Sequence, residues 1–300
     1  QLSSFYTPLI VPSDLADSPA SRPGPFAGRS VTAALWAGVA IALAWSYAAV
    51  LLGLVGHWWT TPDYQHCFLV PVVAGYLLWH RRDLLPAAPR AASSWGLALL
   101  AVSAAMRWAS EYFYYNTLDP LSLLPCAAGL ALLWAGWGGL RWAWPSIVFL
   151  VFMIPIPGTV AGWMSQPLQR IGTTLSTYLI QTLGIPAVAQ GNVIALSAGS
   201  IGVVEACSGL RMLMLFIAVC VCAVLVLPLR PIDKIIVLLS APPIAVVANV
   251  FRITVTAVLH DTVSQELADR VFHDLAGLLM MPLALALVLL ETILLKHLLI

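Results

Sequence analysis

A cysteine suited to nucleophilic chemistry stands at the start of a long apolar stretch, in the segment GVVEACSGLR at residues 202–211. Between residues 208 and 229 the only ionisable side chains are Arg211 and two cysteines, which is typical of a membrane-spanning helix. Cys207 then lies at or just before the first turn, where free backbone N–H groups and the positive end of the helix dipole favour a thiolate. Arg211 follows on the same helical face and adds a second positive charge. Because burying a guanidinium in a bilayer is costly, we interpret this pair as functional.

Two later apolar stretches supply the other groups that acyl transfer needs, Arg252 and His273. In such a reaction a thiolate attacks a peptide carbonyl, and an imidazole passes a proton to the leaving amine and later takes one from the incoming nucleophile. A guanidinium in a pocket of low dielectric stabilises the oxyanion. Cys207, Arg252 and His273 therefore form a candidate catalytic set.

Each of these side chains also has a purely structural explanation. A single cysteine within a membrane is usually a small packing residue, Arg252 can extend its charge to the interface, and His273 can be a solvated loop histidine. For Asn249, one turn before Arg252, we favour a structural hydrogen bond between helices. Glu205, beside the cysteine, either binds an amine or orients a loop, and the sequence leaves both open.

The composition restricts the class of protein. Of the 300 residues, 61% are hydrophobic and 9% are charged, whereas soluble domains have roughly 25% charged residues. We therefore predict an all-α polytopic membrane protein. A net charge of +1 without a basic cluster gives no indication of a nucleic-acid partner. The five cysteines form neither a CxxC pair nor a metal-ligand spacing, so we expect no metal, no cofactor and no quinone-coupled disulfide chemistry.

The apolar stretches divide the chain into a tail and one membrane domain. Residues 1–30 carry many Pro, Ser and Asp residues and predict a flexible cytosolic tail, and the apolar run that follows is too long for a signal peptide. Residues 31–300 form a single predicted transmembrane domain. About eight spanning helices are predicted, at residues 31–55, 64–80, 95–109, 121–137, 142–156, 208–229, 235–259 and 275–295.

One further segment, residues 162–206, is predicted to stay on the outer face of the membrane. At residues 163–183, three glutamines and an arginine fall on one side of an apolar pattern, which favours an amphipathic surface helix over a spanning one. Residues 185–205 alternate around glycine-containing pairs at 191–192 and 199–200, which predicts a short hairpin.

This topology places both termini in the cytosol and satisfies the positive-inside rule. The basic residues that then face the cytosol are Arg22, Arg29, Arg81, Arg82, Arg90, Arg141, Arg230, Lys234 and Lys296. If residues 163–183 spanned the membrane instead, the basic loops before and after it would lie on opposite sides. With eight spans, Cys207, Arg252 and His273 reach one level at the outer face, Arg252 about 10 Å below the end of its helix.

Three motifs resemble those of the exosortase/archaeosortase family: EACSGLR at 205–211, ANVFRI at 248–253 and HDLAG at 273–277. The similarity extends upstream through YQHCFLVPVVAGYLLW at 64–79 and through FMIPIPG, PLQ, GIP and GNVIAL across 152–196. Two positions depart from the pattern: Cys67 stands where many relatives have glycine, and Leu278 where an aromatic residue is frequent. Neither departure touches the catalytic positions.

The resemblance implies a sortase-like cysteine transpeptidase in which Cys207 is the nucleophile, Arg252 the catalytic arginine and His273 the catalytic histidine. Its substrates would be exported proteins that carry a C-terminal Pro-Glu-Pro-type motif, a transmembrane helix and a basic tail. We expect cleavage at the outer face of a prokaryotic cytoplasmic membrane, through a thioester that passes to an amine on a lipid or cell-surface component, or to water. Expected partners are these substrates and membrane lipids. Supporting or substrate-binding roles are expected for Arg211, Glu205, Asn249, Asp274, His66 and Tyr64.

Two other functions also fit these residues. A transporter or export-coupling protein would use the intramembrane Arg211 and Arg252 to bind an anionic lipid or polysaccharide, although the sequence has no visible repeat of the transporter type. A non-catalytic scaffold would dock the same substrate helices, and no single polar substitution would abolish its function.

Overall fold

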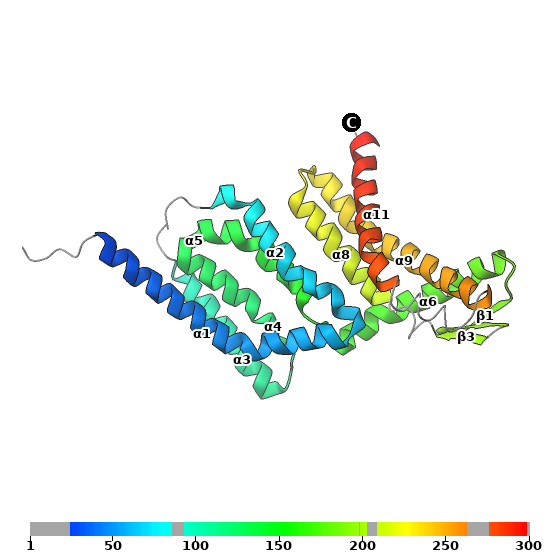
Figure 1. Cartoon of the computed structure of the whole chain (residues 1–300), viewed down its shortest axis with the longest axis horizontal. Coiled ribbons are helices and arrows are strands. Elements are labelled where there is room, and N and C mark those ends of the chain that lie inside the picture. The colour runs from blue at the N-terminus through cyan, green and yellow to red at the C-terminus, as the bar shows by residue number, and fades with distance from the viewer. Residues whose placement is uncertain (1–24, 86–92, 198, 203–208, 263–275, 299–300) are drawn as a thin grey trace, which may run out of the picture. The chain divides into compact units, whose positions relative to one another are not determined.

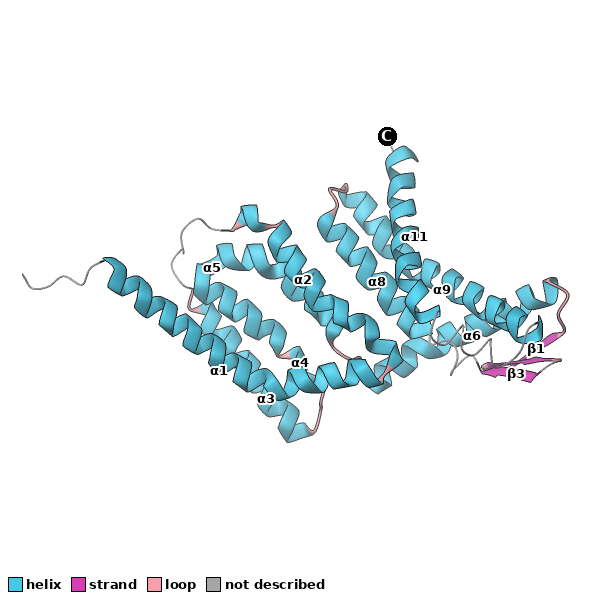
Figure 2. Ribbon diagram, in the orientation of Figure 1, coloured by secondary structure: helices cyan, strands magenta, loops and turns pink. Residues whose placement is uncertain are grey.

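The chain is almost wholly helical in the computed structural model, which describes residues 25–85, 93–197, 199–202, 209–262 and 276–298 (Figures 1 and 2). The helices are α1 (Pro25–Thr60), η2 (Pro62–Phe68), α2 (Leu69–His80), η3 (Arg82–Leu84), α3 (Trp95–Phe113), α4 (Leu118–Leu121), α5 (Leu123–Phe149), η4 (Leu150–Met153), α6 (Gly158–Thr182), α8 (Gly209–Val226), α9 (Pro231–Thr262) and α11 (Ala276–Leu298). The strands described are β1 (Ala187–Gln190), β2 (Val193–Leu196) and β3 (Gly199–Gly202). This confirms the all-α prediction.

Several helices are long and apolar enough to cross a membrane. By length and composition they are Ala34–Thr60, Leu118–Met153 and Pro231–Asp261 among the described residues, and Met212–Val226 and Pro282–Leu295 are shorter apolar helices. The membrane class follows from them, whereas the number of eight spans stays a prediction. The chain forms two compact units, residues 1–49 and 50–300, and the packing described below lies within the second unit.

Helix α5 consists of two arms that fold back at a glycine. Ala135 and Gly136 leave the helical conformation, and Gly136 has φ 59° and ψ −152°, which glycine adopts without steric cost. A Cβ atom on Gly139 would lie 2.6 Å from the carbonyl oxygen of Ala131, although residues eight apart in a straight helix are about 12 Å apart. The chain therefore reverses here, between the two spans predicted at residues 121–137 and 142–156.

The point at which α5 folds back lies beside the C-terminal end of α2. The Trp142 indole N–H donates to the carbonyl oxygen of Leu78 at 3.1 Å, and Arg81 donates to the carbonyl oxygen of Arg141 at 3.2 Å. Two of the arginines that the positive-inside rule assigns to the cytosol therefore lie at the same end of these helices. The Trp58 indole N–H donates to the Met153 carbonyl oxygen, 3.0 Å away at the end of η4.

Helices α8, α9 and α11 share one apolar core. Phe216 and Cys220 of α8 pack with Val237 and Ala241 of α9 and with Val288 of α11, and all of these side chains are buried. Cys220 is therefore a packing residue of this core. Because α8 and α9 are joined by the short connection at residues 227–230, they run antiparallel.

Helix α6 packs a face of small and hydroxyl-bearing residues, together with Ile180, against the protein. Its buried side includes Thr173, Ser176 and Thr177, and the Ser176 hydroxyl donates to the Val250 carbonyl oxygen of α9 at 3.3 Å. Large apolar side chains of the same helix, such as Tyr178, are exposed. The amphipathic helix is therefore present where the sequence predicts it, whereas its location at the membrane surface stays a prediction.

The predicted hairpin is one strand larger than expected. Strands β1, β2 and β3 form an antiparallel sheet in that order, with Gln190 opposite Val193 and Leu196 opposite Gly199. The first predicted turn is correct, because Gly191 has a positive φ of 64° between β1 and β2. The second is wrong: Gly199 begins strand β3, since the chain already reverses after Leu196.

The sheet packs on the C-terminal ends of α6 and α9. Ile194 and Ile201 of the sheet are buried against Ile180 of α6 and against Ile253 and Ala257 of α9. The same small core therefore fixes the last turns of both helices and the strand that leads toward Cys207.

Candidate active site

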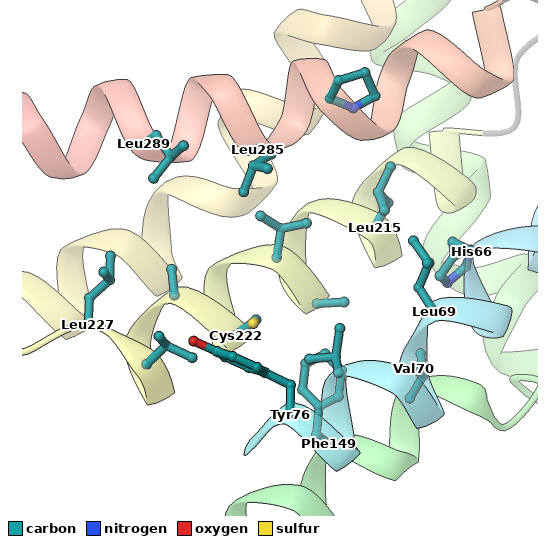
Figure 3. Close-up of a pocket in the computed structure, with 16 residues that line it drawn as sticks. His66, Leu69, Val70, Tyr76, Phe149, Leu215, Cys222, Leu227, Leu285 and Leu289 are labelled. Atoms are coloured by element: carbon teal, nitrogen blue, oxygen red, sulfur yellow. The ribbon is translucent and has the colours of Figure 1, made fainter. Parts of the chain in front are cut away.

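The beginnings of α8 and α11 lie at the same end of the bundle. Figure 3 shows Leu285 and Leu289 of α11 following one another along the cavity in the same direction as Leu215, Cys222 and Leu227 of α8, so α11 runs parallel to α8. Gly209 and Ala276, the first residues of the two helices, therefore lie at the same end of the bundle. Figure 1 shows the opposite end, where the α8–α9 connection and the C-terminus of α11 lie.

Arg252 of α9 lies toward the same end of the bundle. It is 21 residues beyond Pro231, about 32 Å along the helix, whereas the antiparallel α8 extends about 26 Å from Val226 back to Gly209. The Arg252 side chain is only 6% exposed, and its carbonyl oxygen accepts the Thr256 hydroxyl at 2.9 Å. Along the helix axes, the buried Arg252 thus lies about one helical turn beyond the level of Gly209, the first residue of α8.

Asn249 packs where α9 crosses α6. Its side chain is 3% exposed, and its Nδ2 lies 3.4 Å from the position that a Cβ atom of Gly172 would occupy. Its buried Oδ1 accepts no hydrogen bond from any described residue. The neighbour of Asn249 on α6 is a glycine without a side-chain donor for this oxygen, and the interhelical hydrogen bond that we favoured from the sequence stays a prediction. A buried amide oxygen without a donor costs about 1–3 kcal/mol, which a substrate N–H would offset.

Several predicted site residues fall outside the part of the chain that the structure describes. Cys207 precedes the first residue of α8 by two positions, and His273 precedes the first residue of α11 by three. Glu205 and Asp274 lie in the same two segments, and only the backbone of Arg211 is described, as the third residue of α8.

Tyr64 and His66 lie in η2, between α1 and α2. The Tyr64 ring contacts the ring of His57 with centroids 4.9 Å apart. His66 is 7% exposed and lies at one end of the apolar cavity between α2, α8 and α11, near Leu215 (Figure 3). His66 therefore lies beside α8, the helix that follows Cys207 in the sequence. It faces a side of α8 other than the side that packs against α9.

Cys67 is a packing residue. Its side chain is fully buried, and its thiol donates to the carbonyl oxygen of Phe152 at 3.3 Å. The departure from the family pattern at this position therefore changes the contact between η2 and η4 rather than an exposed surface.

The sequence analysis missed one intramembrane carboxylate. The Ser240 hydroxyl of α9 donates to Oε2 of Glu291 on α11 at 2.8 Å. Glu291 is the single charged residue between positions 276 and 295, and an isolated charge in an apolar stretch is the signal that should have indicated it. No group of three or more His, Cys, Asp or Glu side chains suited to a metal occurs among the described residues.

Comparison with protein-family models shows to which family the chain belongs. Residues 58–290 match the family model of the transmembrane exosortases. The chain belongs to the transmembrane exosortase family. No curated protein and no solved structure matches it.

The exosortase match includes every predicted site residue, from Tyr64 to Asp274. Membership supports a membrane protein with a transpeptidase-type role, and exosortases are known as transpeptidases of the cysteine type. Glu291 lies one residue beyond the matched range.

Proposed function

We propose that this exosortase is a cysteine transpeptidase that removes the C-terminal sorting signal of exported proteins. The observation that carries the proposal is that three features lie toward one end of the bundle: the start of α8, the start of α11 and the buried Arg252 of α9. Cys207 and His273 directly precede the two helix starts in the sequence. This arrangement supports a site in which a nucleophile, a proton carrier and a cation act on one peptide bond.

In the proposed reaction the Cys207 thiolate attacks the carbonyl carbon of the scissile bond, and the electron pair moves to the carbonyl oxygen. Arg252 stabilises this oxyanion in a poorly hydrated site, where such contributions are large. His273 gives a proton to the leaving amine, which departs with the substrate's transmembrane helix and basic tail. The exported protein remains as a thioester on Cys207. An acceptor amine or water then loses a proton to His273 and resolves it.

The neighbouring residues support this chemistry. The first turn of α8 favours the thiolate, and Arg211 adds positive charge. Asn249 Oδ1 is available for a substrate N–H, and Glu205, Asp274, Tyr64 and His66 are proposed to orient substrate or the catalytic groups. Among the described residues, β3 pairs only with β2, so an extended substrate peptide can add to its other edge by main-chain hydrogen bonds.

We propose the outer face of a prokaryotic cytoplasmic membrane as the location of this site, with both termini in the cytosol. The support is the common end of Arg81 and Arg141, which fits the positive-inside rule. Exported proteins with a Pro-Glu-Pro-type signal are the proposed substrates, and a lipid or cell-surface amine is the proposed acceptor.

A processing assay in membranes tests the proposal, with a tagged substrate and matched cysteine variants. Cys207→Ala and Cys207→Ser are expected to abolish cleavage at normal protein levels, whereas Cys222→Ala, in the apolar cavity, leaves it unchanged. Arg252→Lys and Arg252→Ala each lower the rate, the alanine variant by about 10²–10³-fold, as for other lost oxyanion donors. Undiminished cleavage by Cys207→Ala would refute the thiol mechanism. If the arginine variants alone then lost function, transport or anion binding would be the better account.

A further inference from the structure

An apolar cavity of about 450 Å³ lies between α2, α8 and α11 (Figure 3). Val73 of α2, Val219 and Ala223 of α8, and Leu285 of α11 form its walls. It lies on the side of α8 that α9 does not cover, so it is separate from the position of Arg252. Of its lining residues, His66, at the end near Leu215, is the one to which the proposed peptide chemistry assigns a part.

The dimensions of this cavity fit one acyl chain. Along α8 it extends from Leu215 to Leu227, about 18 Å, which is close to the roughly 15 Å depth of one leaflet's hydrocarbon. If a methylene group takes about the 30 Å³ of a liquid water molecule, the cavity holds about 15 of them. A helical segment of the same length and about 10 Å diameter would occupy about 1,400 Å³. The cavity is therefore too small for a substrate helix.

One end of the cavity leads to basic side chains on α2. Tyr76 lines the cavity near the end where Leu227 lies (Figure 3), and its ring stacks on His80 with centroids 5.7 Å apart. Arg81 and Arg82 follow directly, and the Arg82 guanidinium lies 4.9 Å from the centroid of the Trp79 ring. An aromatic side chain thus connects the apolar wall to two permanent positive charges.

The α8–α9 connection adds further charge at the same end. Leu227 lines the cavity, and Arg230 and Lys234 follow it within seven residues. The acidic side chains in these two segments are Asp83 and Asp233. Glu291 of α11, two residues beyond the cavity-lining Leu289, adds a third carboxylate. Four cations against three carboxylates still leave this end positive, which is complementary to a phosphate or another anionic head group.

We propose that the cavity binds an acyl chain of an anionic membrane phospholipid, with the head group among Arg82, Arg230 and Lys234. The apolar walls bury the chain and the basic end selects the head group. A zwitterionic lipid of the same chain length would bury its acyl chain equally well. It would lose most of the attraction between head group and basic side chains.

Photocrosslinking of the full chain in nanodiscs tests this proposal. The probes are phosphatidylglycerol and phosphatidylcholine with a diazirine on the same acyl carbon, and mass spectrometry locates the labelled residues. The phosphatidylglycerol probe is expected to label α2 and α8 at the cavity, and unlabelled phosphatidylglycerol to compete. Ala223→Phe fills the cavity and is expected to reduce this labelling about tenfold, because it displaces about two buried methylene groups. Ala98→Phe, an exposed alanine on α3, is the matched control and leaves labelling unchanged.

The head group has its own control. Arg82→Gln combined with Lys234→Gln is expected to make the two probes label the cavity equally, whereas Arg170→Gln, exposed on α6, preserves the preference for phosphatidylglycerol. Equal labelling by both probes in the unmodified protein would overturn the proposal. So would labelling spread evenly over the apolar helices and unaffected by Ala223→Phe. Both measurements are independent of peptide cleavage, so they stand whether or not Cys207 is the nucleophile.

Discussion

Asn192, in the turn between β1 and β2, donates a hydrogen bond from Nδ2 to Oε1 of Gln169 on α6 over 2.9 Å. A second bond, from Gln181 Nε2 to the Ala187 carbonyl oxygen at 2.7 Å, fixes the start of β1 to the last turn of the same helix. The sheet is thus attached to α6 at two points three helical turns apart. Since β3 leads toward Cys207, α6 controls how the chain enters the candidate site.

Removing the first attachment should loosen the sheet without unfolding the bundle. Gln169→Ala deletes the acceptor, at a cost of about 0.5–1.5 kcal/mol, whereas Gln169→Glu retains an acceptor oxygen. Hydrogen exchange should show faster exchange of the amides in β1 and β2 for the alanine variant and nearly unchanged exchange for the glutamate variant. Gln166→Ala, exposed on the same helix, is the control. Identical protection in all variants would mean that this bond does not hold the sheet.

The crossing of α3 and α5 depends on two glycines in mutual contact. A Cβ atom on Gly129 would lie 2.8 Å from the Gly96 carbonyl oxygen, and one on Gly96 would lie 2.7 Å from that of Gly129. Small residues allow this approach of helices in membranes. We expect Gly129→Ala to destabilise the protein by about 1–3 kcal/mol, because overpacking forces the backbones apart. Thermal unfolding in detergent measures the change.

Gly75 provides the matched control for that substitution. It lies within α2, and a Cβ atom there would meet nothing within 4 Å. Gly75→Ala should therefore be neutral or should stabilise the helix by up to about 1 kcal/mol, since alanine is the better helix former. If both variants lowered the melting temperature equally, the close contact of Gly96 and Gly129 would not be the cause.

The sequence predicted most helices because apolar runs and helix breakers act locally. The reversal near residue 136 and the turn at Gly191 both follow from glycines that supply a positive φ. It did not predict that α6 turns Thr173 and Ser176 inward. Sequence periodicity separates two faces of a helix, but which face meets protein and which meets lipid depends on partners distant in the chain, here Val250.

The candidate site was predictable in part for the same reason. Burial of Arg252 follows from its apolar surroundings in the sequence. That the Asn249 Oδ1 has no donor among the described residues could not be foreseen, because it depends on Gly172 being the residue opposite. The hydrogen bond between Ser240 and Glu291 joins residues 51 positions apart in the chain. It forms only when α11 packs against α9, so the sequence alone did not indicate it.

Glu291 is expected to be structural rather than catalytic. It lies 15 residues beyond Ala276, about 22 Å from the start of α11, and its recorded partner is the Ser240 hydroxyl. Glu291→Gln keeps an acceptor oxygen for Ser240 and removes a charge that is costly within a bilayer. We expect unchanged processing and equal or higher thermal stability, whereas Glu291→Leu removes the acceptor and should destabilise. Loss of processing in a stable Glu291→Gln variant would instead assign it a role in the reaction.

Thiol reactivity should distinguish Cys207 from the other four cysteines. Cys67, Cys126 and Cys220 are buried, and Cys222 lines the apolar cavity, so a charged, water-soluble reagent should not reach them. We therefore expect one thiol to react in the native unmodified protein and none in the native Cys207→Ser variant. After denaturation, all five thiols of the unmodified protein should react. An ordinary thiol with a pKa of about 8.5 would react nearly two orders of magnitude more slowly at pH 6 than at pH 8, because its thiolate fraction falls. A thiolate stabilised at the start of α8 should slow much less. If Cys207 also reacted nearly two orders of magnitude more slowly at pH 6 than at pH 8, the helix start and Arg211 would not activate it.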